Sequence, residues 1–353
     1  MRVDYIIVGR GIAGSLLAYL LHEQGKKILI VSNEKLKSAS SVAAGLFNPV
    51  TGKRMVLTWK ANILFPFLHT FYTTMQKKLH VNFYHSKIIY RPFANIEEQN
   101  TWMTQSSDVV WLPFIHTPVD NQFYSEYIRN EYGGFETTLS GYVDLPIMLQ
   151  SIKKYLSEYC LDADFYSGQL TLYKNYCAWN NVECEKIIFC EGAYAAYTPY
   201  FSWLPFVPSK GEVLTARINN FLESRIFNKG VFILPLGKDM YKIGSTYEWS
   251  FTDAEPTSAA KEEIIRKAEA FIKPAVEVIH HEAGIRPTVK DRKPFLGLHP
   301  EYPCLGIFNG LGTKGVSIAP YYAHVFCDFL LKHKNIPAEV NIQRYYSLYS
   351  GSD

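Results

Sequence analysis

The segment Gly-Arg-Gly-Ile-Ala-Gly-Ser at residues 9–15 decides the fold, because three glycines at this spacing need a particular local structure. It follows an apolar run at residues 4–8 that is typical of a buried parallel strand. It leads into a helical pattern over residues 12–25, and a second apolar run follows at residues 26–33. Strand, glycine turn, helix and strand within about 30 residues predict the first βαβ unit of a doubly wound α/β sheet.

The three glycines have separate roles in a dinucleotide site. Gly9 permits the tight turn after the strand, Gly11 lets the backbone approach a pyrophosphate, and Gly14 allows the helix to pack closely on the strand. The N–H groups at the helix start, at Ile12 and Ala13, would hold the phosphates together with the helix dipole. The segment therefore predicts dinucleotide binding rather than a glycine-rich turn without a ligand.

The acidic residue that normally binds the ribose hydroxyls is replaced here. At the end of the second predicted strand, 18 residues after Gly14, the sequence has Ser32. Asn33 or Glu34 could substitute, or Ser32 alone could make the bond. Because a carboxylate is the stronger acceptor for a diol, we expect looser adenosine recognition or recognition by the following loop.

Composition indicates an ordinary globular protein that acts on small molecules. The chain has 353 residues, 48% hydrophobic and 20% charged, which is enough for two domains. The net charge is only +3, and the basic residues are spread along the chain, so the sequence does not indicate a basic surface that would bind nucleic acid or anionic lipid. No leader pattern precedes the first strand and no apolar run reaches about 18 residues, so we expect a cytoplasmic protein without a membrane span. The six cysteines show no metal-ligand or disulfide pattern, and no metal is expected.

Changes of pattern along the chain predict two domains that the chain visits in turn. Short aromatic β-like pieces interrupt the α/β pattern, which later returns and ends in strand, glycine loop and helix. We expect a Rossmann-like α/β domain formed by residues 1–78, 139–207 and 281–353. Residues 79–138 and 208–280 should form a substrate domain built on an antiparallel sheet.

The stretch Ser-Ser-Val-Ala-Ala-Gly-Leu-Phe-Asn-Pro-Val-Thr-Gly-Lys-Arg at residues 40–54 resembles a signature of the D-amino acid oxidase family of FAD-dependent amine and amino-acid oxidoreductases. In that family the hydroxyl side of the segment contacts the FAD pyrophosphate, and its small residues lie against the isoalloxazine ring. Small residues suit this role because they let main chain and its amide hydrogens approach a flat ring. The resemblance implies FAD contacts at Ser40, Ser41, Ala43, Ala44, Gly45 and Leu46.

Further stretches resemble motifs of the same family, in the family's order. They lie at residues 189–195, 208–214, 232–249, 284–297 and 309–320. The first resembles an Ala-Thr-Gly turn beside the cofactor, with Glu191 and Gly192 at the matching positions. Some relatives attach the flavin through a cysteine near the fourth stretch, which here contains none, so the resemblance implies FAD bound non-covalently.

The last of these stretches resembles a glycine loop that leads into a helix aimed at the flavin N1–C2=O edge. The implied chemistry is hydride transfer from an amine-bearing carbon to flavin N5, after which negative charge gathers at that edge. The implied contacts are Gly310, Gly312, Thr313, Lys314 and Gly315. The family more often has small or neutral residues here, so Lys314 either adds a positive charge or is an exposed solubilising lysine.

Arg286 matches the arginine that grips the substrate carboxylate in D-amino acid oxidases, although it could instead pair with Asp291. Where the family has two active-site tyrosines, this sequence has Phe227 and Phe232, which cannot hydrogen-bond a carboxylate. Plain D-amino acid oxidation is therefore in doubt. Tyr247 could supply a hydroxyl from another direction.

Other readings remain open at this stage. Arg54 and Trp59 either line the pocket or serve ordinary packing. A flavin enzyme for 2-hydroxy acids would need a general base such as His69 or His280. A non-catalytic FAD-binding subunit is the third reading. For an oxidoreductase, the electron acceptor would be O2 or another molecule.

Overall fold

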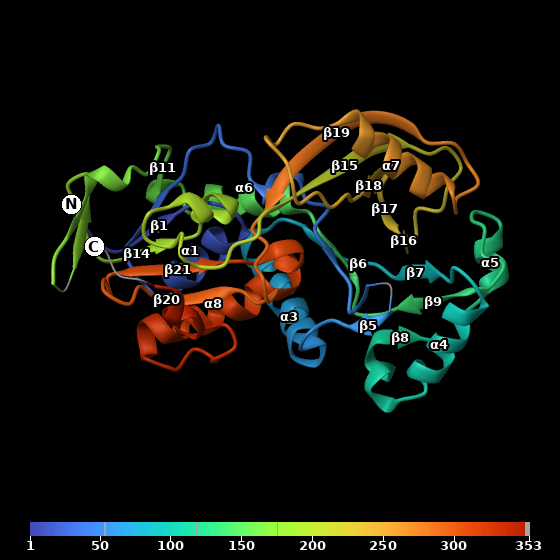
Figure 1. The fold of residues 1–353 in the computed structure, drawn as a ribbon, viewed down its shortest axis with the longest axis horizontal. Coiled ribbons are helices and arrows are strands. Elements are labelled where there is room, and N and C mark those ends of the chain that lie inside the picture. Colours follow the sequence, from blue (N-terminus) through green and yellow to red (C-terminus); the bar gives the residue numbers. More distant parts are fainter. Residues whose placement is uncertain (53, 118, 175, 350–353) are drawn as a thin grey trace.

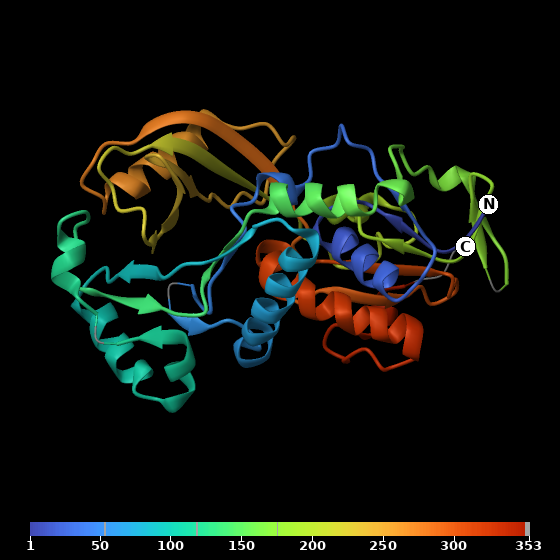
Figure 2. The same cartoon turned by 180° about the vertical axis from the view of Figure 1, so that it is seen from behind.

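The computed structural model describes residues 1–52, 54–117, 119–174 and 176–349. Two lobes, each built on a large sheet, lie side by side along the long axis (Figure 1). The view from behind shows that α1, α3 and α8 cover one side of the first sheet, while the second sheet and its helices form the other end of the molecule (Figure 2).

The first sheet has a parallel centre in the order β11-β2-β1-β14-β21. These strands are β1 (Arg2–Val8), β2 (Ile28–Val31), β11 (Cys160–Leu161), β14 (Val182–Phe189) and β21 (Leu305–Asn309). Antiparallel additions at its edge are β12 (Leu170–Leu172), β13 (Cys177–Trp179) and β20 (Phe295–Leu298). The βαβ unit predicted from the opening residues is present, with β1 and β2 joined through a helix.

Four helices bury one face of this sheet in a shared apolar core. They are α1 (Ile12–Glu23), α3 (Ala61–Leu79), α6 (Leu145–Tyr155) and α8 (Gly315–Lys332). α1 is apolar on nearly all sides because it packs against α6 and α8 as well as the sheet. The Asp144 side chain accepts a hydrogen bond from the Ile147 amide and so caps α6. The opposite face packs against residues 200–206 and η6 (Ile342–Leu348).

The second sheet has the order β19-β15-β18-β17-β16-β7-β9-β8 and is antiparallel except between β16 and β7. Its strands are β7 (Ile89–Pro92), β8 (Ile115–His116), β9 (Gly134–Thr137), β15 (Ser209–Arg217), β16 (Ile226–Lys229), β17 (Val231–Gly237), β18 (Met240–Gly244) and β19 (Glu277–Arg286). Helix α7 (Ser258–Glu269) buries one face of this sheet through Ile264 and Ala268. The other face looks toward the first lobe.

Short elements connect the two lobes. They are α2 (Ala39–Val42), β3 (Leu46–Phe47), β4 (Val50–Thr51), β5 (Val56–Leu57), β6 (Tyr84–Ser86), β10 (Gly141–Val143) and the 3-10 turns η4 (Gly192–Tyr197) and η5 (Gly312–Lys314). β3, β10 and β6 form a small sheet, and β4 pairs with β5. α2 packs against β19, so the segment with the family resemblance lies between the lobes.

The sequence missed several helices. α3 follows directly after the resemblance segment, and α4 (Ile96–Ser106), η1 (Val109–Phe114) and α5 (Asn121–Ser125) lie among residues expected to be mainly strands. The proposed domain boundaries stay a prediction, and β19 crosses the one at residue 281. Within the described residues, no helix is both long and apolar enough to cross a membrane.

Candidate active site

The glycine turn after β1 brings α1 unusually close to the strand. A side chain on Gly14 would place its Cβ 2.0 Å from the carbonyl oxygen of Gly9, a distance that real Cβ contacts do not show. Gly11, which starts α1, provides no side-chain cap. The Ile12 amide donates to a serine hydroxyl, so the next amides, at Ala13 and Gly14, are the ones that an anion would bind, as at other helix N-termini that bind phosphates.

Two other chain segments meet the start of α1. The hydroxyl of Ser40, directly before Ser41 in α2, accepts a hydrogen bond from the Ile12 amide at 3.1 Å. A side chain on Gly315, at the start of α8, would place its Cβ 3.5 Å from Cγ2 of Ile12. The glycine turn, the Ser40 segment and the 310–315 loop, far apart in sequence, thus meet at one residue.

The segment Val42–Gly45 is fixed at both ends. Lys242 of β18 donates from Nζ to the Val42 carbonyl at 2.8 Å, and the Val143 amide donates to the Gly45 carbonyl at 3.0 Å. Gly45 has a φ of +69°, and a Cβ there would lie 1.9 Å from the Val143 carbonyl oxygen. Between these anchors Ala43 is exposed and Ala44 is half-buried beside Leu46. The result is a side-chain-poor stretch of backbone that a flat ring can approach.

The three candidates for the missing ribose acid have different surroundings. Asn33 donates from Nδ2 to Asp164 Oδ1 at 2.8 Å. Glu34 pairs with Lys153 and with Arg10, and these hydrogen bonds hold its pKa below the usual range. Within the described chain, no hydrogen bond is recorded for the Ser32 hydroxyl. Ser32 is therefore the candidate whose side chain is available to a ribose.

The 310–315 loop adjoins the Glu191–Gly192 turn through Asn309, whose Nδ2 donates to the Gly192 carbonyl at 3.0 Å. Farther along this loop Thr313 is exposed, whereas the Lys314 side chain turns inward. Lys314 Nζ donates to Thr51 Oγ1 at 3.2 Å and to Thr58 Oγ1 at 3.4 Å.

Burial, with a smaller contribution from Arg292, lowers the pKa of Lys314. The reading of Lys314 as an exposed solubilising lysine is therefore wrong. Its inward position follows from the β4–β5 hairpin, which presents two threonine hydroxyls to its ammonium group.

Arg286 is a mostly buried cation without an acidic partner among the residues that the structure describes. Its Nη1 donates to the Thr246 carbonyl at 3.0 Å, and its Nη2 donates to Ser245 Oγ at 2.9 Å. The Tyr247 ring covers the guanidinium with its centroid 4.5 Å away, and Tyr247 is itself 57% exposed.

The expected alternative partner of Arg286 is engaged elsewhere. Asp291 pairs with Arg344 Nε at 3.0 Å, so the Arg286–Asp291 pair considered from the sequence is wrong. Burial lowers the pKa of Arg286, with Tyr247 opposing this. A buried guanidinium bonded only to neutral oxygens retains most of its attraction for an anion.

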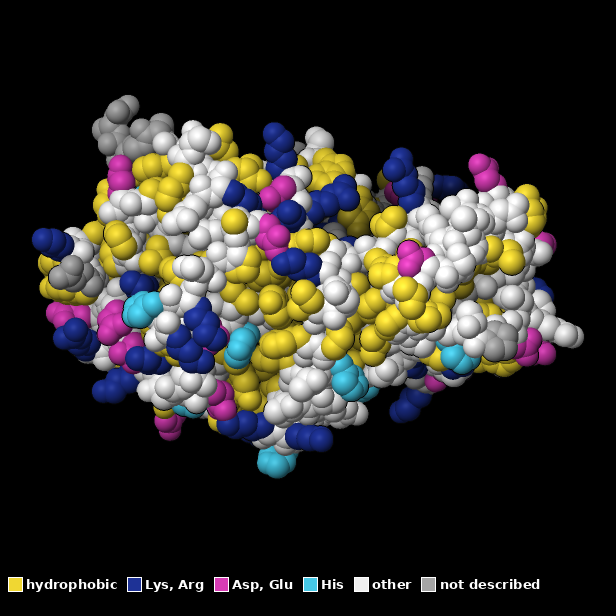
Figure 3. Space-filling view, turned by 90° about the horizontal axis from the view of Figure 1, so that it is seen from below, with side chains coloured by type: hydrophobic (Ala, Val, Ile, Leu, Met, Phe, Trp, Pro, Cys, Tyr) yellow, Lys and Arg dark blue, Asp and Glu magenta, His cyan; other side chains and the backbone are white. Residues whose placement is uncertain are grey.

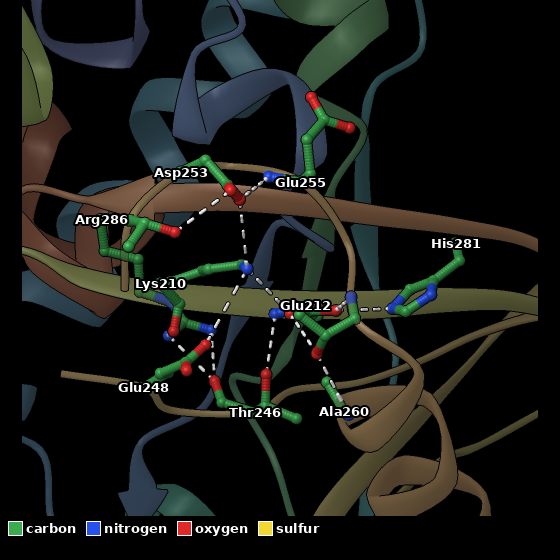
Figure 4. Close-up of polar contacts among 11 residues, drawn as sticks. Lys210, Glu212, Thr246, Glu248, Asp253, Glu255, Ala260, His281 and Arg286 are labelled. Atoms are coloured by element: carbon green, nitrogen blue, oxygen red, sulfur yellow. Dashed lines mark hydrogen bonds and ion pairs between the residues drawn. The ribbon is translucent and has the colours of Figure 1, made fainter. Parts of the chain in front are cut away.

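A network of charged residues lies beside Arg286 (Figure 4). Lys210 Nζ lies 3.4 Å from Glu212 Oε1, and Glu212 Oε2 accepts from the Thr257 amide at 2.8 Å and lies 2.8 Å from His281 Nε2. Glu212 thereby ties the start of α7 to β15 and compensates the buried Lys210. This network was not expected from the sequence, although two charged residues within the otherwise apolar strand β15, Lys210 and Glu212, were a signal for it.

The other residues that the sequence suggested for the substrate pocket lie in different parts of the structure. Phe232 packs in the apolar cluster with Ala44 and Leu46, whereas Phe227 lies in the α7 core on the other face of the sheet. Trp59 stacks on Tyr322 with a centroid distance of 5.7 Å, and Arg54 is exposed. These positions correct the idea that both phenylalanines occupy one site.

The two histidines considered as general bases, His69 and His280, do not contact Arg286 in the described structure. His69 Nδ1 lies 2.9 Å from the Tyr84 hydroxyl, and His280 is exposed on β19. The described residues contain no group of three or more side chains that could hold a metal ion. A recess with Lys and Arg side chains along its rim opens near the middle of the molecule (Figure 3).

These features together fit FAD. The glycine turn leaves room that a Cβ would fill, the start of α1 offers amides, and the Val42–Gly45 backbone is exposed through small residues. A diphosphate suits the first two and a flat ring suits the third.

Comparison with known proteins identifies the family. Residues 4–329 match the family model described as FAD dependent oxidoreductase. The glycine oxidase of Pseudomonas aeruginosa is 27% identical over 151 residues, which is 41% of this chain and 42% of that protein. The chain therefore aligns with less than half of the length of this curated relative.

Solved structures show the same fold. The glycine oxidase of Geobacillus kaustophilus superimposes with a TM-score of 0.80 at 17% identity, covering 100% of both chains. The iminodiacetate oxidase of a Chelativorans species gives a TM-score of 0.77 at 20% identity, covering 97% of this chain and 98% of that one. The predicted Rossmann-like α/β fold with a second, antiparallel sheet is confirmed.

The family match extends from β1 to the end part of α8, which includes every motif on which the resemblance was based. FAD is thereby confirmed as the cofactor that these motifs predict. The chain belongs to the family of FAD dependent oxidoreductases.

Proposed function

We propose that this protein oxidises an amine that carries a carboxylate, such as an amino acid, and that Arg286 binds the carboxylate. The observation that carries the proposal is the partly enclosed Arg286 guanidinium, which lacks an acidic partner in the described part of the chain. A carboxylate supplies the missing negative charge beside a guanidinium whose hydrogen bonds all go to neutral oxygens. The names of the relatives, glycine oxidase and iminodiacetate oxidase, support this substrate class.

The residues around Arg286 prepare the site for such a substrate. Hydrogen bonds to Thr246 and Ser245 and the cover of Tyr247 fix the guanidinium plane, so a bound carboxylate would be oriented at little entropic cost. Phe232 adds an apolar wall beside Ala44, which favours the neutral form of the amine. The FAD that we propose to bind here accepts hydride at N5.

The cofactor-contacting residues of this proposal are those expected from the motifs. They are Gly9, Gly11, Ile12, Ala13, Gly14, Ser32, Asn33, Ser40, Ser41, Ala43, Ala44, Gly45, Leu46, Glu191, Gly192, Gly310, Gly312, Thr313, Lys314 and Gly315. Asn33 is the weakest member, because its amide already binds Asp164. We further propose O2 or another small acceptor as the oxidant and the cytoplasm as the location, which suits six unpaired cysteines.

A panel of substrates under anaerobic conditions tests the proposal. Amino acids and N-substituted glycines should bleach the flavin absorbance, whereas neutral amines of similar shape should do so much more slowly. Bleaching by 2-hydroxy acids alone would favour the alternative in which a base removes a hydroxyl proton. No bleaching by any class would favour a non-catalytic FAD-binding subunit.

Lys314 should stabilise the reduced cofactor through its charge. We expect Lys314→Met to slow flavin reduction by about 100-fold, the usual effect of losing one preorganised charge-stabilising group. Burial lowers the Lys314 pKa, so the lysine loses its charge at a lower pH than an exposed lysine does. The rate of flavin reduction in the wild type should therefore fall as the pH rises through this lowered pKa, and the rate in the variant should not show this fall.

Stopped-flow reduction across pH measures both effects. Lys290→Met, which removes an exposed lysine from the chain between Arg286 and β20, is the matched control and should leave the rate unchanged. An unchanged rate in Lys314→Met would restrict this lysine to packing against Thr51 and Thr58.

A further inference from the structure

Glu191 occupies an unusual place between two glycine loops. It follows β14, the strand between β1 and β21, so its turn lies where three parallel strands end. A Cβ on Gly9 would lie 3.2 Å from the Glu191 Cα, and on the other side Asn309 donates to the carbonyl of Gly192.

Among the residues that the structure describes, Glu191 has no cationic partner. Its recorded side-chain contact is a hydrogen bond from Thr198 Oγ1 to Oε2 at 2.8 Å, and the described residues include no ion pair to it. Cations on the neighbouring elements are directed elsewhere: Arg10 to Glu34, Lys314 to two threonines, and Arg286 to carbonyl oxygens.

The other titratable neighbour is Cys190, whose thiol is buried and has a raised pKa. Burial likewise raises the pKa of Glu191 to about 7, and the Thr198 hydrogen bond only partly opposes this. The neutral form of the Glu191 carboxyl is therefore favoured more than that of an ordinary glutamate.

We propose that FAD binds to this protein together with one proton, which Glu191 takes up. The physical reason is that the FAD diphosphate brings two negative charges into the space between the same glycine loops. A carboxylate without a nearby cation is disfavoured beside such charges and becomes neutral. The inference rests on the assignment of FAD to these loops but not on any substrate.

Linkage gives the sign of the effect. FAD binding raises the pKa of Glu191 further, so the affinity is greatest below about pH 7 and falls as the pH rises through the range between the free and bound values. Within that range the dissociation constant should increase by about tenfold per pH unit, which corresponds to one proton per FAD. Below it the constant should be independent of pH.

The experiment is equilibrium release of FAD from diluted holoprotein, followed by the fluorescence of free FAD between pH 6 and 9. Glu191→Gln, which resembles the neutral acid, should bind FAD with a pH-independent constant close to the wild-type value at pH 6. Glu34→Gln is the matched control, since its low pKa keeps it charged throughout and its loss should leave the wild-type pH slope intact.

A wild-type constant that does not change with pH, or a Glu191→Gln variant with the wild-type slope, would overturn the proposal. Weaker binding by Glu191→Gln at every pH would also overturn it, because Glu191 would then act as a charged acceptor. Thermal unfolding of both variants confirms that they fold. If the protein contains FAD but its affinity for FAD does not change with pH, the proposed amino-acid oxidation still stands. If the protein contains no FAD, both the proton uptake by Glu191 and the proposed oxidation are contradicted.

Discussion

Replacing Gly14 with alanine is expected to weaken FAD binding by about 100-fold, the equivalent of about 3 kcal/mol of forced displacement in a packed site. The added Cβ would lie 2.0 Å from the Gly9 carbonyl oxygen and 3.2 Å from Cys190 Cβ. Because the first of these contacts involves backbone, no side-chain movement relieves it, and α1 must shift away from β1. The shift displaces the first helix amides from the phosphates that they would bind.

Release of FAD from diluted holoprotein measures this change. Gly168→Ala is the control, because a Cβ on Gly168 meets no heavy atom within 4 Å, and it should bind FAD like the wild type. Full FAD affinity in a folded Gly14→Ala variant would show that the turn after β1 does not hold the cofactor.

Replacing Arg286 with leucine is expected to reduce kcat/KM for an amino acid by about 1000-fold, since truncating one partner of a buried charged pair costs about 4 kcal/mol. The loss should appear mainly in KM, because the guanidinium contacts the carboxylate, which keeps its charge and its bonds while the neighbouring C–H bond reacts. For a neutral amine of the same shape the change should stay within about fivefold, because no carboxylate is left unpaired. Arg286→Lys should recover part of the loss for the acid.

Steady-state kinetics with a matched acid and amine separate these outcomes. Arg217→Leu is the control, because Arg217 lies on the neighbouring strand β15 in an exposed pair with Glu277 at 3.2 Å. An equal loss for both substrates would mean that Arg286 only supports the backbone around Thr246.

The features that the sequence predicted correctly are those encoded by local constraints. Gly9, Gly14 and Gly45 stand where backbone approaches backbone, so their spacing carries the information by itself. The strands β1 and β2 on each side of this unit are short apolar runs, which were recognisable from their composition. Such signals do not depend on distant parts of the chain.

The features that the sequence did not reveal depend on register. Phe227 and Phe232 are close in sequence, but the β16–β17 hairpin pairs Phe227 with Ile233 and Asn228 with Phe232. Paired residues share a face of the sheet, so the two phenylalanines point to opposite faces. Likewise Asp291 is near Arg286 in sequence, yet it forms its ion pair with Arg344 from the C-terminal part of the chain.

The contact from Lys242 to the Val42 carbonyl has a mechanical consequence. Lys242 belongs to the sheet that would receive the substrate, and Val42 belongs to the backbone that we propose to lie over the flavin. A hinge motion that parts the lobes must break this contact and loosen that backbone at the same moment. A ligand that favours the joined lobes would then also favour the bound cofactor, and each would raise the affinity of the other by the same factor.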